Sequence, residues 1–279
     1  MTDVLDVYRW ELRKLRRQRR SYLGLAFAAL SGPVFVVALV LGAPAPDVVY
    51  GTAVRTSGLA IPLILLSYAA RFGVGALIVA IVAGNIVAAE DEQRTLKTIL
   101  TRSFGRTQIF LGKLLAAATY TVVALVTMGV FATAAGTAAW GFAPLPTIAT
   151  GGEPPAVSTA VTHSAAAGLG WIAASYAVYL LPLLGFLAIA LFLSTVTRNG
   201  AAAIVGTLML AVALYGVVEA VKGRLRSYVL ATHFDAWQGL LQAEPDWSPT
   251  GQALWICALY ILVPLAAALA YFAHRDVSG

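Results

Sequence analysis

Long apolar runs dominate this sequence and limit what it can fold into. Stretches of about 20 apolar residues, each enough for a helix that crosses a bilayer, alternate with short charged segments. Apolar residues make up 59% of the chain and charged residues only 11%, whereas a soluble domain carries about 25% charge. The sequence therefore predicts an all-α membrane protein with several transmembrane helices.

The apolar runs predict six spans within one transmembrane domain, residues 1–279. The spans are expected at about 22–42, 70–89, 107–135, 169–193, 201–218 and 252–273. Residues 59–69 are also apolar, and the sequence leaves open whether they extend the second span or dip into the outer leaflet. Residues 219–250 mix charged and aromatic side chains, which predicts short outer helices lying against the membrane before the last span.

The N-terminal residues 4–20 form a basic amphipathic segment. Arg9, Arg13, Arg16 and Arg20 line one side of a helix, and apolar side chains line another. Such a helix would lie along the lipid headgroups, attracted by anionic lipid. A second interpretation, that the arginines only orient the first span, is compatible with the first.

Positive charge is distributed unevenly between the two sides of the predicted spans. With the N-terminus inside, 14 of the 19 Lys and Arg residues fall on the inner side. Inner loops of membrane proteins are enriched in Lys and Arg. We therefore expect the chain to lie in the plasma (inner) membrane with both termini in the cytoplasm. The net charge of +6 is gathered beside apolar runs, which favours orientation in a membrane over binding of nucleic acid.

Residues 90–104, between the second and third predicted spans, are too charged for a bilayer core. As a helix, this segment would carry an apolar face and a charged rim, because residues three and four apart lie on the same side. This pattern suits docking against a soluble partner. The candidate docking residues are Glu90, Glu92, Thr95, Leu96, Ile99, Leu100 and Arg106.

Motifs of enzymes and carriers are missing from the sequence. Residues 105–113 do not have the spacing of a phosphate-binding loop, and the single Cys257 forms no disulfide framework. No carboxylate lies deep in a predicted span, which disfavours a proton-coupled carrier. We expect no catalytic residue, metal site or cofactor in this chain. Arg71, near the outer end of the second span, is expected to reach the interface or a polar contact between spans.

Residues 84–113 resemble the signature of ABC-2 type transporter permeases. The matches are Ala88-Ala89-Glu90, Thr95-Leu96, Leu100, Arg106 and Gly112-Lys113. Two positions depart from the pattern, because Arg94 replaces a usual Gly and Ser103 a usual Pro. The N-terminal segment is similar to the cytoplasmic interface helix of that family, and residues 194–199 are similar to its inner break.

The resemblance implies a subunit without its own motor. Such permeases pair two membrane chains, identical or different, with two cytoplasmic ABC ATPases that bind ATP and Mg²⁺. A coupling helix after the second span, here residues 90–104, docks into a groove of the ATPase, with Glu90 and Glu92 facing basic residues there. Export of a hydrophobic or amphipathic substrate, such as a drug, peptide antibiotic or lipid, is expected. A motor-independent channel or carrier and a membrane-embedded lipid-modifying enzyme remain as alternatives.

Overall fold

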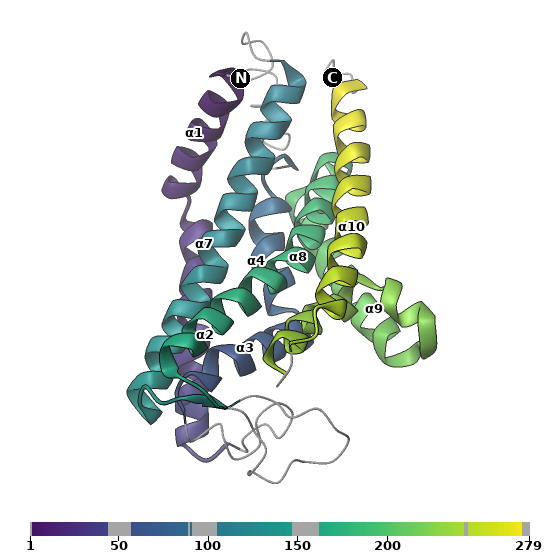
Figure 1. Ribbon diagram of the computed structural model, residues 1–279. Coiled ribbons are helices and arrows are strands. Elements are labelled where there is room, and N and C mark those ends of the chain that lie inside the picture. Colours follow the sequence, from purple (N-terminus) through teal and green to yellow (C-terminus); the bar gives the residue numbers. More distant parts are fainter. Residues whose placement is uncertain are drawn as a thin grey trace.

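The computed structural model describes residues 2–43, 57–88, 90, 105–146, 162–242 and 245–274. These residues are helical apart from short loops and one pairing of two-residue strands, β1 (Leu145–Pro146) with β2 (Thr162–His163). The chain begins and ends at the same end of the molecule, which we call the terminal end (Figure 1). The predicted all-α class is confirmed.

Five helices of the described residues are long and apolar enough to cross a membrane. Each lies over one of the predicted spans. They are α2 (Arg19–Val40), α7 (Arg106–Trp140), α8 (Ala165–Thr197), α9 (Gly200–Ala220) and α10 (Ser248–His274). With 35 residues and a rise of 1.5 Å per residue, α7 is about 52 Å long. It is therefore longer than the roughly 30 Å hydrocarbon core.

The second predicted span differs from the expectation of one helix over residues 70–89. Two helices occupy this region, α3 (Ala60–Arg71) and α4 (Val74–Ala83), and they are bent by 68° relative to each other. Gly73, at the bend, has a φ of 65°, which glycine adopts without the steric cost that a Cβ would bring. The described chain therefore has six crossings only if the bent pair counts as one, and residues 59–69 largely form α3.

Helix α1 (Thr2–Arg17) is separate from α2, because Gln18 between them is extended. α1 packs along the first part of α7 and buries Val7 and Leu15 there. The predicted interface helix over 4–20 is thus broken at residue 18, and Arg20 belongs to α2.

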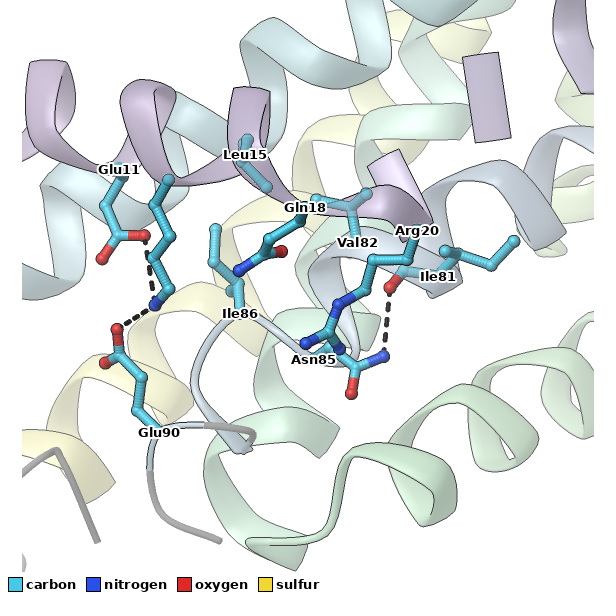
Figure 2. Close-up of a pocket in the computed structure, with 10 residues that line it drawn as sticks. Glu11, Leu15, Gln18, Arg20, Ile81, Val82, Asn85, Ile86 and Glu90 are labelled. Carbon is cyan, nitrogen blue, oxygen red and sulfur yellow. Dashed lines mark hydrogen bonds and ion pairs between the residues drawn. The ribbon is translucent and has the colours of Figure 1, made fainter. Parts of the chain in front are cut away.

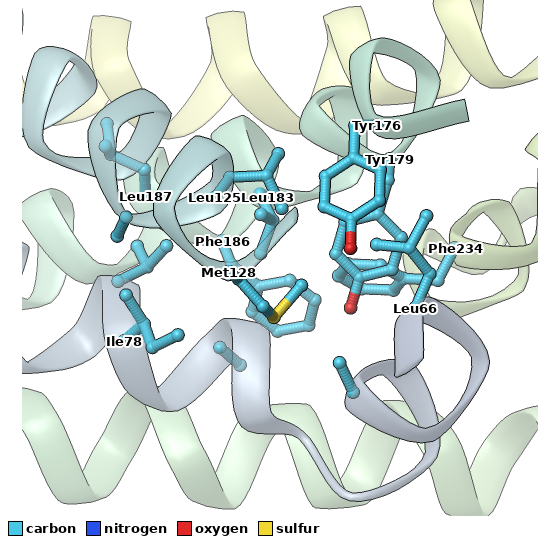
Figure 3. Packing of buried hydrophobic residues seen from close by; sticks show 14 of the residues in the cluster. Leu66, Ile78, Leu125, Met128, Tyr176, Tyr179, Leu183, Phe186, Leu187 and Phe234 are labelled. Carbon is cyan, nitrogen blue, oxygen red and sulfur yellow. The ribbon is translucent and has the colours of Figure 1, made fainter. Parts of the chain in front are cut away.

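The segment before α10 also differs from the prediction. It forms two 3₁₀ helices, η2 (Gly223–Tyr228) and η3 (Leu230–Leu241). η2 is largely exposed, as expected for an outer helix, but η3 packs against α8 and α10 with Trp237 completely buried. Phe234 of η3 lies between the rings of Tyr179 and Phe186, at centroid distances of 4.8 and 5.8 Å (Figure 3). These aromatic contacts hold η3 in the core of the protein.

Candidate functional site

Four charged residues meet near the terminal end, where α1, α7 and the segment after α4 come together. Glu11 and Lys14 lie on α1, Lys113 lies on α7, and Glu90 is the first residue of the segment predicted to dock a partner. Lys113 has no exposed surface, and Glu11 and Glu90 are 1% and 2% exposed. We call these four residues the charge cluster.

Positive and negative groups alternate in the charge cluster. The Lys113 ammonium lies 2.6 Å from Glu11 Oε1 and 2.7 Å from Glu90 Oε2, and it donates a hydrogen bond to the carbonyl oxygen of Ile86 at 3.1 Å. Lys14 pairs with Glu90 and lies 3.8 Å from Glu11 Oε2. Figure 2 shows the carboxylates of Glu11 and Glu90 on either side of a lysine ammonium, to which dashed lines join both of them. Two cations and two anions thus neutralise each other inside the protein.

The neighbouring charges outweigh the effect of burial on Glu90. Burial by itself would raise the pKa of this carboxyl, but the positive charges of Lys113 and Lys14 lower the pKa below its usual value of 4.5. Glu90 is therefore ionised at neutral pH. Because removal of one partner leaves the other charge buried and unpaired, the four side chains depend strongly on one another.

Close packing sets the position of α1 on α7. A Cβ at Gly112 would lie 2.5 Å from Val7 Cγ1 and 3.1 Å from the backbone nitrogen of Tyr8. The helices approach closely because residue 112 has no side chain. Tyr8 directly follows Val7 in α1, and its hydroxyl is hydrogen-bonded at 3.0 Å to that of Thr119, about two turns beyond Gly112 in α7. These contacts place Lys113 beside Glu11.

The segment that leads from α4 to Glu90 is anchored to α8. The backbone N–H groups of Val87 and Ala88 donate to the hydroxyl of Ser194, at 3.3 and 3.0 Å, and Ser194 is fully buried. Nearby, a Cβ at Gly200 would overlap the side chain of Asn85. Glu90 is therefore fixed relative to α8 through the backbone and to α1 and α7 through its carboxylate.

The start of α7 is also tied to the end of α10. The Arg106 guanidinium donates a hydrogen bond to the carbonyl oxygen of Ala273 at 2.9 Å. One turn into α7, the rings of Phe110 and Phe272 lie 6.0 Å apart. The contacts near the terminal end thus link five helices, α1, α4, α7, α8 and α10. The charge cluster lies among them.

A small cavity of about 30 Å³ adjoins the charge cluster (Figure 2). Its polar lining includes Glu11, Gln18, Arg20 and Asn85. Glu11 Oε2, buried here, accepts no hydrogen bond from the described residues. A space of this size is large enough for one or two water molecules. No three His, Cys, Asp or Glu side chains of the described chain gather in a way that would hold a metal ion.

Only part of the predicted site lies within the described residues. Glu92, Thr95, Leu96, Ile99 and Leu100 lie outside them. Glu90 was expected to face a partner, but in the structure its carboxylate is buried and paired within the chain. Arg106, also predicted to dock a partner, donates its hydrogen bond to the Ala273 carbonyl oxygen of α10.

The predicted membrane-interface arginines fall into two groups. Arg9, Arg13 and Arg16 are exposed on α1, and Arg20 of α2 is only partly exposed and lines the cavity. Away from the charge cluster, Arg71 is exposed as the last residue of α3. Burial raises the pKa of Asp235 in η3, and the charges of Arg71 and then Arg226 counteract this rise. Arg71 therefore acts electrostatically on η3.

Sequence reasoning missed three members of the charge cluster as site residues. Lys113 entered only as part of the Gly112-Lys113 match, and Glu11 and Lys14 were not singled out. The available signals were a lysine inside an apolar run and an acidic residue at helical spacing from apolar ones. Neither signal shows that Glu11 and Lys113 pair with each other, since the two residues are 102 positions apart in the sequence.

Residues 47–278 match the family described as "Protein of unknown function (DUF2705)". A comparison with curated proteins gave no match.

Proposed function

The chain belongs to the DUF2705 family, and we propose that it is the membrane-spanning permease subunit of an ATP-driven ABC exporter. In this proposal a separate pair of cytoplasmic ATPases binds ATP and Mg²⁺. A second permease chain completes the transporter in the plasma (inner) membrane, and both termini face the cytoplasm. The cargo is a hydrophobic or amphipathic molecule such as a drug, a peptide antibiotic or a lipid.

The observation that carries the proposal is the burial of Glu90 in the charge cluster. Glu90 is the first residue of the predicted coupling helix, 90–104, and its carboxylate is paired with both α1 and α7. A force applied to the coupling helix would therefore reach these helices through the ion pairs of Glu90, whose own carboxylate is almost completely buried. An arrangement of this kind suits a subunit driven from outside its own chain.

Residues that carry the resemblance to ABC-2 permeases also come together in space. Glu90, Gly112 and Lys113 lie in or beside the charge cluster, and Ser194, from the predicted inner break, anchors Ala88. These residues are separated by up to about 100 positions in the sequence. Their convergence supports a shared role, because residues that matched only by chance would have no reason to meet.

The test is co-purification of the ATPase from membranes of the native host in mild detergent. We expect an untagged partner of about 25–35 kDa, the mass of a nucleotide-binding subunit of roughly 250 residues. Leu96→Asp combined with Leu100→Asp should release this partner, because burial of each Leu is worth roughly 1.5–3 kcal/mol and the new charges would need to be desolvated.

Thr98→Asp is the matched control, since it adds charge within the same segment but on another predicted face. It should retain the ATPase. A Leu96→Asp, Leu100→Asp protein that inserts into the membrane, keeps its ATPase and transports normally would overturn the proposal, as would a wild-type chain that transports without any ATPase.

A further inference from the structure

The helices pack in two groups, one around α7 and one around α8. α1 and α2 lie along α7 and form the α7 group, whereas α9, α10 and η3 lie along α8 and form the α8 group. After α4 the chain passes through Ile86, Val87, Ala88 and Glu90, which we call the joint. Polar contacts connect the joint to both groups.

The α8 group holds the joint through one hydroxyl group. Ser194 Oγ accepts hydrogen bonds from the N–H groups of Val87 and Ala88, at 3.3 and 3.0 Å, and none of the three residues has exposed surface. In a continuous α-helix these N–H groups would donate to carbonyl oxygens four residues earlier, but residues 84–87 form a turn. Because a buried N–H group without an acceptor is costly, Ser194 stabilises the path that the chain takes out of α4.

The α7 group holds the joint on either side of these two N–H groups. The Lys113 ammonium donates a hydrogen bond to the Ile86 carbonyl oxygen at 3.1 Å and lies 2.7 Å from Glu90 Oε2. Lys14 of α1 pairs with the same carboxylate. The bonds to α8 at positions 87 and 88 therefore lie between bonds to the α7 group at positions 86 and 90.

We infer that Ser194 is a positioning residue that couples α8 to α1 through the joint. Hydrogen bonds weaken steeply when their length and angle depart from the preferred values, so a displacement of Glu90 changes its ion pairs and the Ser194 bonds together. Apolar contacts between packed helices, by contrast, permit small sliding movements. In the proposed transporter, a movement of the coupling helix therefore reaches both groups of helices. This use of the coupling rests on the proposed function, whereas the coupling itself requires no ATPase.

The test is hydrogen exchange of the purified full chain in lipid nanodiscs, measured by mass spectrometry, because exchange reports the local opening of each segment. Ser194→Ala removes the acceptor of the two N–H groups in the joint. Ser175→Ala is the matched control, since Ser175 is also fully buried on α8 but its hydroxyl donates within the helix, to the Trp171 carbonyl oxygen.

Ser194→Ala should accelerate exchange in α1, around Glu11 and Lys14, by about fivefold or more, the lower end of the usual coupling between two sites. Ser175→Ala should leave exchange in α1 unchanged. Acceleration confined to α8 and the joint would overturn the inference. Equal acceleration in all helices would also overturn it, because that result would show a general loss of stability and no specific coupling.

Coupling between two sites is reciprocal, so a second pair of variants decides the question if Ser194→Ala folds poorly. Lys14→Met removes a partner of Glu90 and should accelerate exchange at Val87 and Ala88 by about fivefold or more. Arg13→Met removes an equal charge from an exposed neighbouring position of α1 and should not change exchange in the joint. Equal exchange in the two variants would overturn the inference. Since neither pair of variants involves an ATPase, the proposed function would still be decided by co-purification.

Discussion

At the scale of single residues, Lys113 is the centre of the charge cluster. It is completely buried and pairs with Glu11 and Glu90, which lie on separate parts of the chain. Glu11 and Glu90 are almost completely buried, so each carboxylate depends on the Lys113 ammonium to stabilise its negative charge. The loss of any one of these charges would therefore weaken the connection between α1 and the segment after α4.

The first prediction concerns the balance of charge at Lys113. Lys113→Met should destabilise the protein by about 3–5 kcal/mol, because two buried carboxylates then share only Lys14. The double variant Lys113→Met, Glu11→Leu keeps the Glu90–Lys14 pair, so it should recover a large part of this loss. Thermal unfolding in detergent, arranged as a double-mutant cycle, measures both changes. Additive losses would show that Glu11 and Lys113 do not act as a pair.

At the scale of elements, the position of α1 depends on a glycine of α7. Gly112 allows the two helices to approach until residue 112 meets Val7 and the backbone of Tyr8. The charge cluster forms only at this separation, because Glu11 and Lys113 have to lie within ion-pair distance. The ion pairs of the site therefore depend on the close packing of α1 against α7.

The second prediction is that Gly112→Val weakens the docking of α1. The added side chain overlaps Val7, and overpacking of this kind typically costs about 1–3 kcal/mol. Limited trypsin digestion should then cleave α1 faster, at its exposed residues Arg13 and Arg16. Gly216→Val on α9 is the control, since a Cβ there meets nothing within 4 Å. Equal rates of α1 cleavage in the two variants would contradict the proposed role of Gly112.

At the scale of the whole molecule, both ends of the chain lie at the terminal end (Figure 1). This arrangement needs an even number of crossings, and the bent pair α3–α4 supplies the sixth if it counts as one. The charge cluster and the Ser194 anchor also lie toward the terminal end, so the proposed connection to an ATPase lies on one side of the membrane.

The third prediction tests this topology. Thr197 and Ser248 are both exposed, Thr197 at the end of α8 and Ser248 at the start of α10. In intact cells an impermeant thiol reagent should label Ser248→Cys and leave Thr197→Cys unlabelled until the cells are opened, because Thr197 is on the cytoplasmic side in our assignment. The native Cys257 is buried and should contribute little. Labelling of Thr197→Cys from outside would reverse the orientation.

The sequence by itself determined the features that depend on local composition. Apolar runs of about 20 residues predict helices of membrane length, and five such helices lie over predicted spans. The amphipathic pattern of residues 4–20 also predicted the helix α1 as far as Arg17, on which Arg9, Arg13 and Arg16 are exposed, but it did not predict the break at residue 18. In each case the cause is periodicity or hydrophobicity within one segment, and a segment carries this information without reference to the rest of the chain.

Only the tertiary structure decided how distant segments meet. The bend at Gly73 and the burial of η3 by Tyr179 and Phe186 depend on neighbours that no local pattern names. The pairing of Lys113 with Glu11 is of the same kind, because a buried charge is stabilised by a partner whose place in the sequence is set by packing alone. The chain's composition made a membrane protein predictable, and the close approach of α1 and α7 at Gly112 placed its charges together.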